Sequence, residues 1–212
     1  RLQIPQQDSN VYQSIFGVEG SEDNELMKPL VSSRGMFWPL TPTMTIQHSA
    51  NYNPLAQTHS NYPFQAYQNS QVDSINVIGE FPVQNSEDAK HWVATVAFLR
   101  TVTKMYFGKQ QALKGNPPPI LHLSGYGDHM YNKVPVVVNT FNLELRQGID
   151  YISTKQNDSS FTTARTRERM GLPELEKYQT WAPTLSNVSV LLTPIYSRES
   201  IKNFSMKLKI LV

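Results

Sequence analysis

The chain of 212 residues contains no cysteine. This absence excludes a disulfide framework, a thiol nucleophile and the thiolate ligands of zinc and iron–sulfur sites, so stability must come from packing or assembly. Long apolar runs are also missing. The longest aliphatic stretch, residues 134–138, is far below the roughly 20 residues that a membrane helix needs, so no membrane segment is expected.

Charged side chains are scarce as well. They make up 17% of the chain, whereas about 25% is usual for soluble domains. The formal net charge is only +2, with residues 1–80 acidic and residues 81–212 basic. Binding to a nucleic-acid backbone needs a clustered basic face, so it is not expected here. Because the chain begins at Arg1 without a methionine or a signal-peptide pattern, we expect it to be part of a longer or processed product.

The first third of the chain has little periodicity. An acidic cluster at 19–25 precedes a stretch, residues 35–72, that contains no Asp, Glu, Lys or Arg. Four prolines in that stretch exclude a long helix; they are Pro39, Pro42, Pro54 and Pro63. Alternation in 38–46 indicates one strand, interrupted by a proline. The pattern predicts an extended, mostly irregular N-terminal arm over residues 1–71 that lies on another surface.

The remainder, residues 72–212, has the pattern of a packed β domain. Apolar and polar side chains alternate in 74–81, as in a half-buried strand. A helix is then predicted over about 86–106, capped by Asn85 or Ser86. The residues predicted to anchor this helix in the core are Trp92, Val96 and Leu99.

Further strands are predicted at 134–145, 188–192 and 204–210, where apolar residues again alternate with polar ones. A long polar loop, about 155–182, separates the first two. Strands outnumber helices, which favours a mainly β fold. The expected architecture is two packed antiparallel sheets, in a sandwich or barrel, with one buried α-helix.

Several of these segments are expected to contact other copies. Strands leave open edges unless another chain continues the sheet, and the strands at 134–145 and 204–210 are predicted to do so. The loop at 155–182 has few apolar residues whose burial could offset the loss of backbone entropy on ordering. We therefore expect it to become ordered only in contact with a neighbouring subunit. The residues predicted to make contacts between subunits or between rings are Arg165, Arg167, Arg169, Asn142, Lys207 and Lys209.

Signals for catalysis or metal binding are missing. The closest histidine group, His122, Asp128 and His129, lacks a fourth ligand and is interpreted as polar turn and strand residues. The Gly-Tyr-Gly at 125–127 lacks the third glycine and the helix of a dinucleotide-binding fingerprint, and no GxSxG elbow is present. We expect no catalytic, cofactor-binding or metal-binding residues, no cofactor and no enzymatic activity.

A series of short strings within residues 72–212 carries a resemblance to a known family. The first are EFPVQNSEDA at 80–89, then Trp92 and FLRTVTKM at 98–105. The later strings are PPPIL at 117–121, GYG at 125–127, VPVVV at 134–138, DYI at 150–152, PT at 183–184 and LTPIYSR at 192–198. In this order they resemble the tube domain of baseplate tail-tube junction proteins of contractile-tailed bacteriophages. Residues 1–71 and the long loop take no part in the resemblance.

The resemblance implies a fold shared with tail-tube and type VI secretion tube proteins, with two packed antiparallel sheets and a helix. It also implies a hexameric ring that joins the baseplate hub to the tail tube and initiates tube polymerisation. The partners would be further copies of the chain, the tail tube protein and other hub or junction proteins. DNA would pass transiently through the lumen of a virion tail assembled in the host cytoplasm.

Two other classes of function stay open. A carbohydrate- or receptor-binding β-sandwich of a phage fibre or adhesin needs an exposed aromatic platform, for which the candidates are Tyr52, Tyr62 and Tyr67. A hydrolase is the third class, and no motif supports it. Oligomeric mass separates the first two classes, because a ring of six copies indicates a tube protein and a trimer indicates a fibre.

Overall fold

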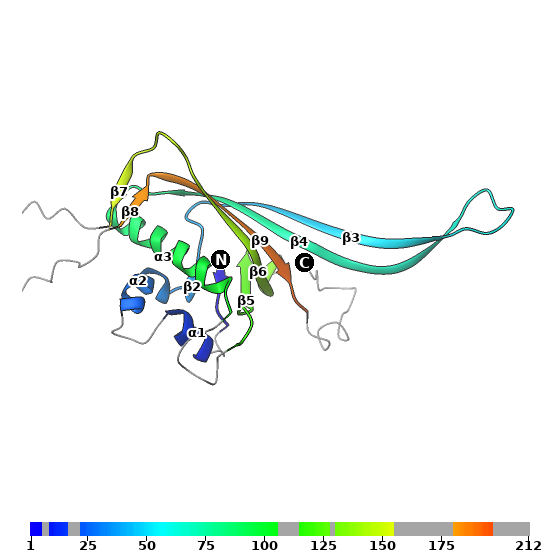
Figure 1. Ribbon diagram of the computed structural model, residues 1–212, viewed down its shortest axis with the longest axis horizontal. Coiled ribbons are helices and arrows are strands. Elements are labelled where there is room, and N and C mark those ends of the chain that lie inside the picture. The colour runs from blue at the N-terminus through cyan, green and yellow to red at the C-terminus, as the bar shows by residue number, and fades with distance from the viewer. Residues whose placement is uncertain (6–8, 17–21, 106–114, 128–129, 155–179, 197–212) are drawn as a thin grey trace, which may run out of the picture.

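The computed structural model describes residues 1–5, 9–16, 22–105, 115–127, 130–154 and 180–196. Within these ranges the protein is mainly β, as the sequence predicts. Seven strands form one antiparallel sheet in the order β2-β1-β5-β6-β9-β4-β3, and β7 and β8 form a separate two-stranded sheet (Figure 1). The strands are β1 (Leu2–Gln3), β2 (Gly35–Met36), β3 (Thr43–Leu55), β4 (Phe64–Pro82), β5 (Leu121–Gly125), β6 (Tyr131–Leu145), β7 (Tyr151–Ser153), β8 (Trp181–Pro183) and β9 (Leu185–Pro194).

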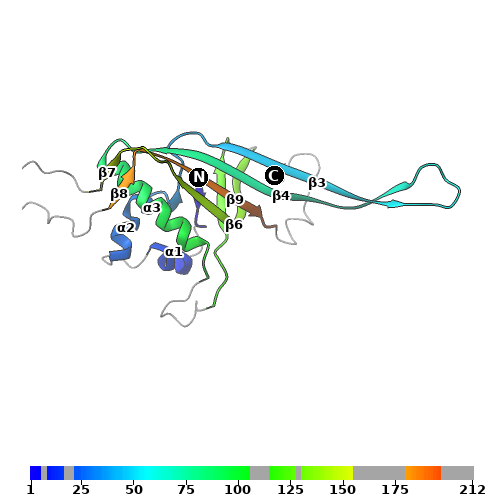
Figure 2. The same cartoon turned by 45° about the horizontal axis from the view of Figure 1, so that its top comes forward.

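Three helices cover one face of the large sheet (Figures 1 and 2). They are α1 (Ser9–Phe16), α2 (Glu22–Val31) and α3 (Ser86–Val102). Phe16 of α1 and Phe98 of α3 are fully buried, and their rings stack with centroids 6.1 Å apart. The layer that packs on the large sheet therefore consists of helices, whereas a second packed sheet was expected. The second sheet has only two strands and lies beside α3.

The N-terminal part is more regular than its sequence predicts. Residues 1–71 contain α1, α2, three strands and the first part of β4, so the expectation of a mostly irregular arm is wrong. Leu2, Phe16 and Leu30 are completely buried, which shows that these short elements complete the core. Their periodicity is hard to recognise because α1 and α2 span 8 and 10 residues and Pro29 lies inside α2. β4 also continues through residue 72 without a break.

Helix α3 begins as its sequence predicts. Asn85 is the N-cap, and its side-chain oxygen accepts a hydrogen bond from the backbone N–H of Asp88 at 2.8 Å. The helix ends at Val102, before the predicted end near residue 106, which lies outside the described residues. The three predicted core residues Trp92, Val96 and Leu99 are all buried. The Trp92 indole Nε1–H donates to the buried Ser186 Oγ of β9 at 2.7 Å, which joins the helix to the sheet.

Most of the other predicted strands are present. The segments predicted at 134–145 and 188–192 lie within β6 and β9, whereas 204–210 lies outside the described residues. The loop predicted at 155–182 is described only in its last three residues, where β8 begins. The strand predicted at 38–46 starts only at Thr43, because the two prolines before it lack a backbone donor for the ladder.

Candidate assembly surface

The most prominent exposed feature is the hairpin of β3 and β4. The two strands stay paired as far as Leu55 and Phe64. β9 pairs with β4 only over Ile75–Pro82, so among the described residues the segment 47–74 has no neighbouring strand. We call this segment the outer hairpin. Figures 1 and 2 show that it extends away from the helices and from the rest of the sheet.

The outer hairpin is polar but almost uncharged. Asp73 is its only charged residue, and the Asp73 carboxylate accepts hydrogen bonds from Ser49 Oγ at 3.0 Å and from Gln71 Nε2 at 2.6 Å. Asn51 Nδ2 donates to Asn69 Oδ1 across the two strands at 2.9 Å. Neutral side-chain contacts of this kind stabilise a strand pair without placing further charges on its surface.

Two β-bulges interrupt the ladder of the outer hairpin. The register between β3 and β4 shifts twice, which leaves Asp73 and Gln68 as the extra residues of β4. A bulge bends and twists its strand, and so makes the edge of that strand less able to form a regular ladder with a further strand. The bulges therefore limit which other strand can pair with β4 along this segment.

Large apolar and aromatic side chains are exposed along the outer hairpin. Tyr62 near the tip is 83% exposed, and Leu55 and Phe64 beside it are 53% and 63% exposed. Nearer the base, the rings of Tyr52 and Tyr67 meet edge to face with centroids 5.7 Å apart. A two-stranded hairpin alone is only marginally stable in water, and grouped exposed apolar residues mark interaction surfaces. This hairpin is therefore the leading candidate for a contact with another molecule.

The large sheet also has open strand edges. β3 is the last strand on one side. A second open edge lies within the sheet, where β6 extends beyond its neighbour β5. β6 pairs with β5 only over Tyr131–Val136, although its pairing with β9 continues to Leu145. Within the described ranges, residues 137–145 therefore have a neighbour on one side only. Asn142 lies in this segment, exposed and directly opposite Ser189. Unpaired backbone groups along such an edge can add a strand from another chain.

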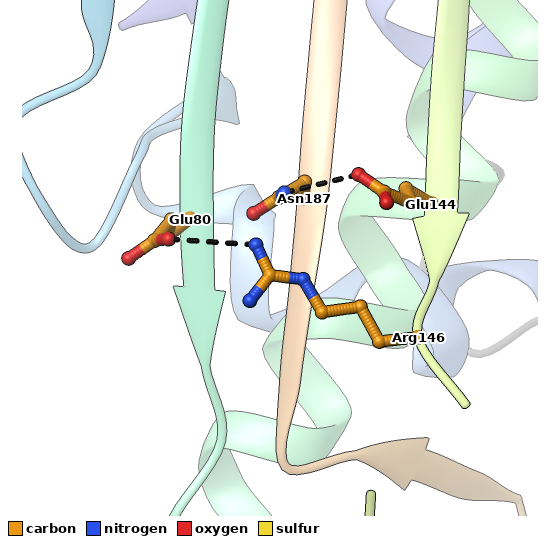
Figure 3. A network of polar contacts seen from close by, with 4 residues as sticks. All are labelled: Glu80, Glu144, Arg146 and Asn187. Carbon is orange, nitrogen blue, oxygen red and sulfur yellow. Dashed lines mark hydrogen bonds and ion pairs between the residues drawn. The ribbon is translucent and has the colours of Figure 1, made fainter. Parts of the chain in front are cut away.

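A row of polar contacts crosses the outer face of the sheet beside this edge (Figure 3). Glu80 of β4, Asn187 of β9 and Glu144 of β6 lie directly opposite one another. Asn187 Nδ2 donates to Glu144 Oε2 at 3.0 Å, and Arg146 Nη2 lies 3.8 Å from Glu80 Oε1. Both members of this ion pair are largely exposed, so it contributes only about 0 to 1 kcal/mol. These side chains link three neighbouring strands on the outer face of the sheet, where the Asn187 Oδ1 atom is buried and has no hydrogen-bond partner among the described residues.

Of the six residues predicted to contact other subunits, Asn142 alone lies within the described residues. The five that lie outside them are Arg165, Arg167, Arg169, Lys207 and Lys209. In the histidine group, His122 is half-buried in β5, and Asp128 and His129 also lie outside the described residues. Among the residues that the structure does describe, no group of three or more His, Cys, Asp or Glu side chains could hold a metal ion.

The three candidate platform tyrosines all lie on the hairpin, but they do not form one platform. Tyr52 and Tyr67 are cross-strand partners, whereas Tyr62 lies beyond the last paired residues, at the tip. Sequence reasoning missed two other exposed apolar side chains near the tip, Leu55 and Phe64. The available signal was the uncharged stretch 35–72, within which residues 48–55 pair with residues 64–72.

No protein-family model matches the chain, and a search of curated proteins finds no match. None of the helices in the described ranges is long and apolar enough to cross a membrane.

Proposed function

We propose that the protein is a structural component of a bacteriophage tail that forms a hexameric ring, joins the baseplate hub to the tail tube and initiates tube polymerisation. The observation that carries this proposal is the outer hairpin, which among the described residues has no further strand on either edge and is largely exposed on both faces from residue 50 to residue 71. An uncovered two-stranded hairpin gains little stability by itself. Neighbouring subunits in a ring, or in the next ring of a stack, would cover it.

Sheet continuation between copies supplies the contact around the ring. The one-sided segment of β6, residues 137–145, offers a row of backbone donors and acceptors to an edge strand of the adjacent copy. In a closed ring each edge is paired, so the aggregation risk of an exposed edge disappears. Six copies would then enclose a lumen through which DNA passes.

The finer fold assignment, a tail-tube-like domain, rests on the resemblance of the strings between residues 80 and 198. Two features support it: the mainly antiparallel sheet and the buried helix α3 that follows β4. The hairpin would reach a subunit of a neighbouring ring, either the tail tube protein or a hub or junction protein. The ring would accordingly be part of the virion tail.

Oligomeric mass and electron microscopy test this proposal directly. The purified protein, examined by sedimentation velocity and by negative-stain microscopy, should give hexamers that appear as rings with a central hole. A trimer would instead support a fibre module. A protein that stays monomeric at all concentrations, and also in the presence of tail tube protein, would refute the ring.

The second candidate function is carbohydrate or receptor binding. It is favoured by one observation, the edge-to-face pair of half-exposed tyrosines Tyr52 and Tyr67, because aromatic rings stack on the apolar faces of sugars. Titration with a panel of bacterial surface glycans tests it. Binding that is lost in Tyr67→Ala, together with a trimeric mass, would establish this function in place of the ring.

A further inference from the structure

A pocket of about 360 Å³ lies between parts of the large sheet that are not adjacent. Met44 of β3 and Val77 of β4 line it together with Leu123 of β5 and Tyr131 of β6. β9 separates these two pairs of strands in the sheet. The space between the start of β3 and the end of β5 is therefore not filled by packed side chains, which leaves room for movement there.

The connection from β2 to β3, residues 37–42, also lines the pocket. We call this segment the strap. Its middle residues, Pro39, Leu40 and Thr41, are exposed, and no hydrogen bond of theirs is found among the described residues. The proline rings at 39 and 42 fix the backbone angle φ at two of its six positions. The strap is therefore short and stiff, and only its two ends hold it in place.

The first end of the strap is firmly anchored. Trp38 is 9% exposed, and its indole lies so close to the backbone of Gly79 in β4 that a Cβ at that glycine would not fit. Beside it, the rings of Phe37 and of His91 in α3 lie with centroids 4.3 Å apart. Moving this end would expose a large apolar side chain to water, which is unfavourable.

The second end of the strap is held by one hydrogen bond. Tyr126, in the turn after β5, donates its hydroxyl hydrogen to the backbone oxygen of Pro42 at 3.1 Å. We call this bond the latch. Tyr126 is 55% exposed, and a hydrogen bond between neutral groups that water can reach adds little net stability. The second end can therefore separate while Trp38 stays in place.

The backbone of the turn favours such a movement. Tyr126 has a φ of +57°, in the left-handed region that residues other than glycine rarely adopt. Strain of this kind is found at clamps and switches. Glycines flank Tyr126 on both sides, so the turn can change its conformation easily. Relaxation of the tyrosine backbone would offset part of the free energy that is lost when the latch opens.

We propose that the strap is a hinged flap over the pocket, fixed at Trp38 and releasable at Pro42, with the Tyr126 hydroxyl as the latch. In the closed form it ties the start of β3 to the end of β5. In the open form it uncovers Met44 and Leu123, and the base of the hairpin can move relative to β5 while every strand stays paired. This inference goes beyond the proposed assembly and does not depend on it, because both ends of the strap are held within one chain.

Thiol reactivity tests the flap, and the absence of native cysteines makes each introduced thiol unique. Met44→Cys places a thiol in the pocket, and its rate of reaction with a maleimide is measured on the full-length protein. Adding Tyr126→Phe keeps the ring and removes the hydroxyl. The open population, and with it the reaction rate, should rise about two- to tenfold, as expected for the loss of one neutral hydrogen bond. Leu123→Cys, in β5, is a second probe of the pocket and should respond in the same way.

Two controls match these variants. Tyr151→Phe removes the hydroxyl of another exposed tyrosine, at 50% exposure against 55% for Tyr126, and should leave the Met44→Cys rate unchanged. Ile46→Cys lies on β3 at a half-buried position outside the pocket, and its rate should not respond to Tyr126→Phe. Equal Met44→Cys rates with and without the Tyr126 hydroxyl would show that the latch does not hold the strap. An equal acceleration at Ile46→Cys would indicate a general loosening of β3, and either result overturns the inference.

Discussion

The contact between Trp92 and Ser186 allows a quantitative test of how α3 is held on the sheet. Trp92 is 8% exposed and Ser186 is completely buried, and the hydrogen bond between Nε1 and Oγ is 2.7 Å long. The two residues are 94 positions apart in the chain, so the bond joins elements that only the folded state brings together. Replacing either residue should therefore affect the global free energy of unfolding.

The expected magnitudes differ between the variants. Trp92→Ala removes a large buried side chain and should cost about 3 to 5 kcal/mol. Ser186→Ala leaves the indole N–H without a partner and should cost about 1 to 3 kcal/mol. Trp92→Phe keeps much of the apolar contact but leaves the Ser186 hydroxyl without a partner, so it should also cost about 1 to 3 kcal/mol, as Ser186→Ala does. The double variant Trp92→Phe/Ser186→Ala should cost about 1 kcal/mol less than the sum of the two single changes, since no unpaired buried group remains.

Urea unfolding, followed by circular dichroism so that the loss of a tryptophan does not alter the signal, measures these free energies. For a chain of this size, the loss in Trp92→Ala corresponds to a decrease in Tm of about 6 to 20 °C. A loss below about 1 kcal/mol in Trp92→Ala would be typical of a surface position. That result would refute the assignment of α3 as the central core helix, whatever the oligomeric state.

Four further changes test other parts of the structure. Gly79→Ala would place a Cβ 2.1 Å from Trp38 Cδ1 and should lower the unfolding free energy by about 2 kcal/mol or more; an unchanged Tm would contradict this packing. Thr95→Val removes a buried hydroxyl that has no partner among the described residues and should raise the unfolding free energy by about 1 kcal/mol, which thermal unfolding would detect. Burial lowers the pKa of His91 from its ordinary value of 6.5, so the unfolded chain binds the proton first and stability should fall as the pH drops below about 6.5. His91→Phe should flatten the dependence of Tm on pH in that range, and an equal slope in both proteins would argue against His91 as its source. Asn142→Pro removes a backbone donor from the one-sided part of β6 and should prevent ring formation in sedimentation velocity, whereas normal rings would exclude pairing at this edge.

The sequence predicts the elements whose periodicity and caps are strong. Helix α3 has a 17-residue span, an Asn N-cap and two acidic residues in its first turn, so its start and its buried side chains could be read directly. Strands β6 and β9 could be predicted equally well, because their apolar residues alternate with polar ones over many positions and belong to the buried core. In these elements local pattern and tertiary environment agree.

The helices α1 and α2 and the hairpin could not be read in the same way. α1 and α2 are short, and their buried residues complete a core that is formed mainly by distant parts of the chain. The hairpin lacks the usual alternation because neither face of its outer part is buried, and a period of two appears only when one face is. The pocket that Met44, Leu123 and Tyr131 line could not be predicted, since β3, which carries Met44, is not adjacent in the sheet to β5 or β6, which carry the other two residues.

The distribution of charge separates two possible driving forces for assembly. The outer hairpin carries one charged residue, Asp73, and its carboxylate is already bonded to two neighbours on the hairpin. A contact made by this surface must therefore depend on apolar burial and on hydrogen bonds between neutral groups. Salt screens these two contributions to the binding free energy very little, because neither involves a pair of charges. The contact expected from Arg165, Arg167 and Arg169 depends on opposite charges and must weaken as salt rises. If subunits join mainly through the hairpin, assembly will therefore persist at high ionic strength, and the arginines will influence the rate of association more than the final stability of the ring.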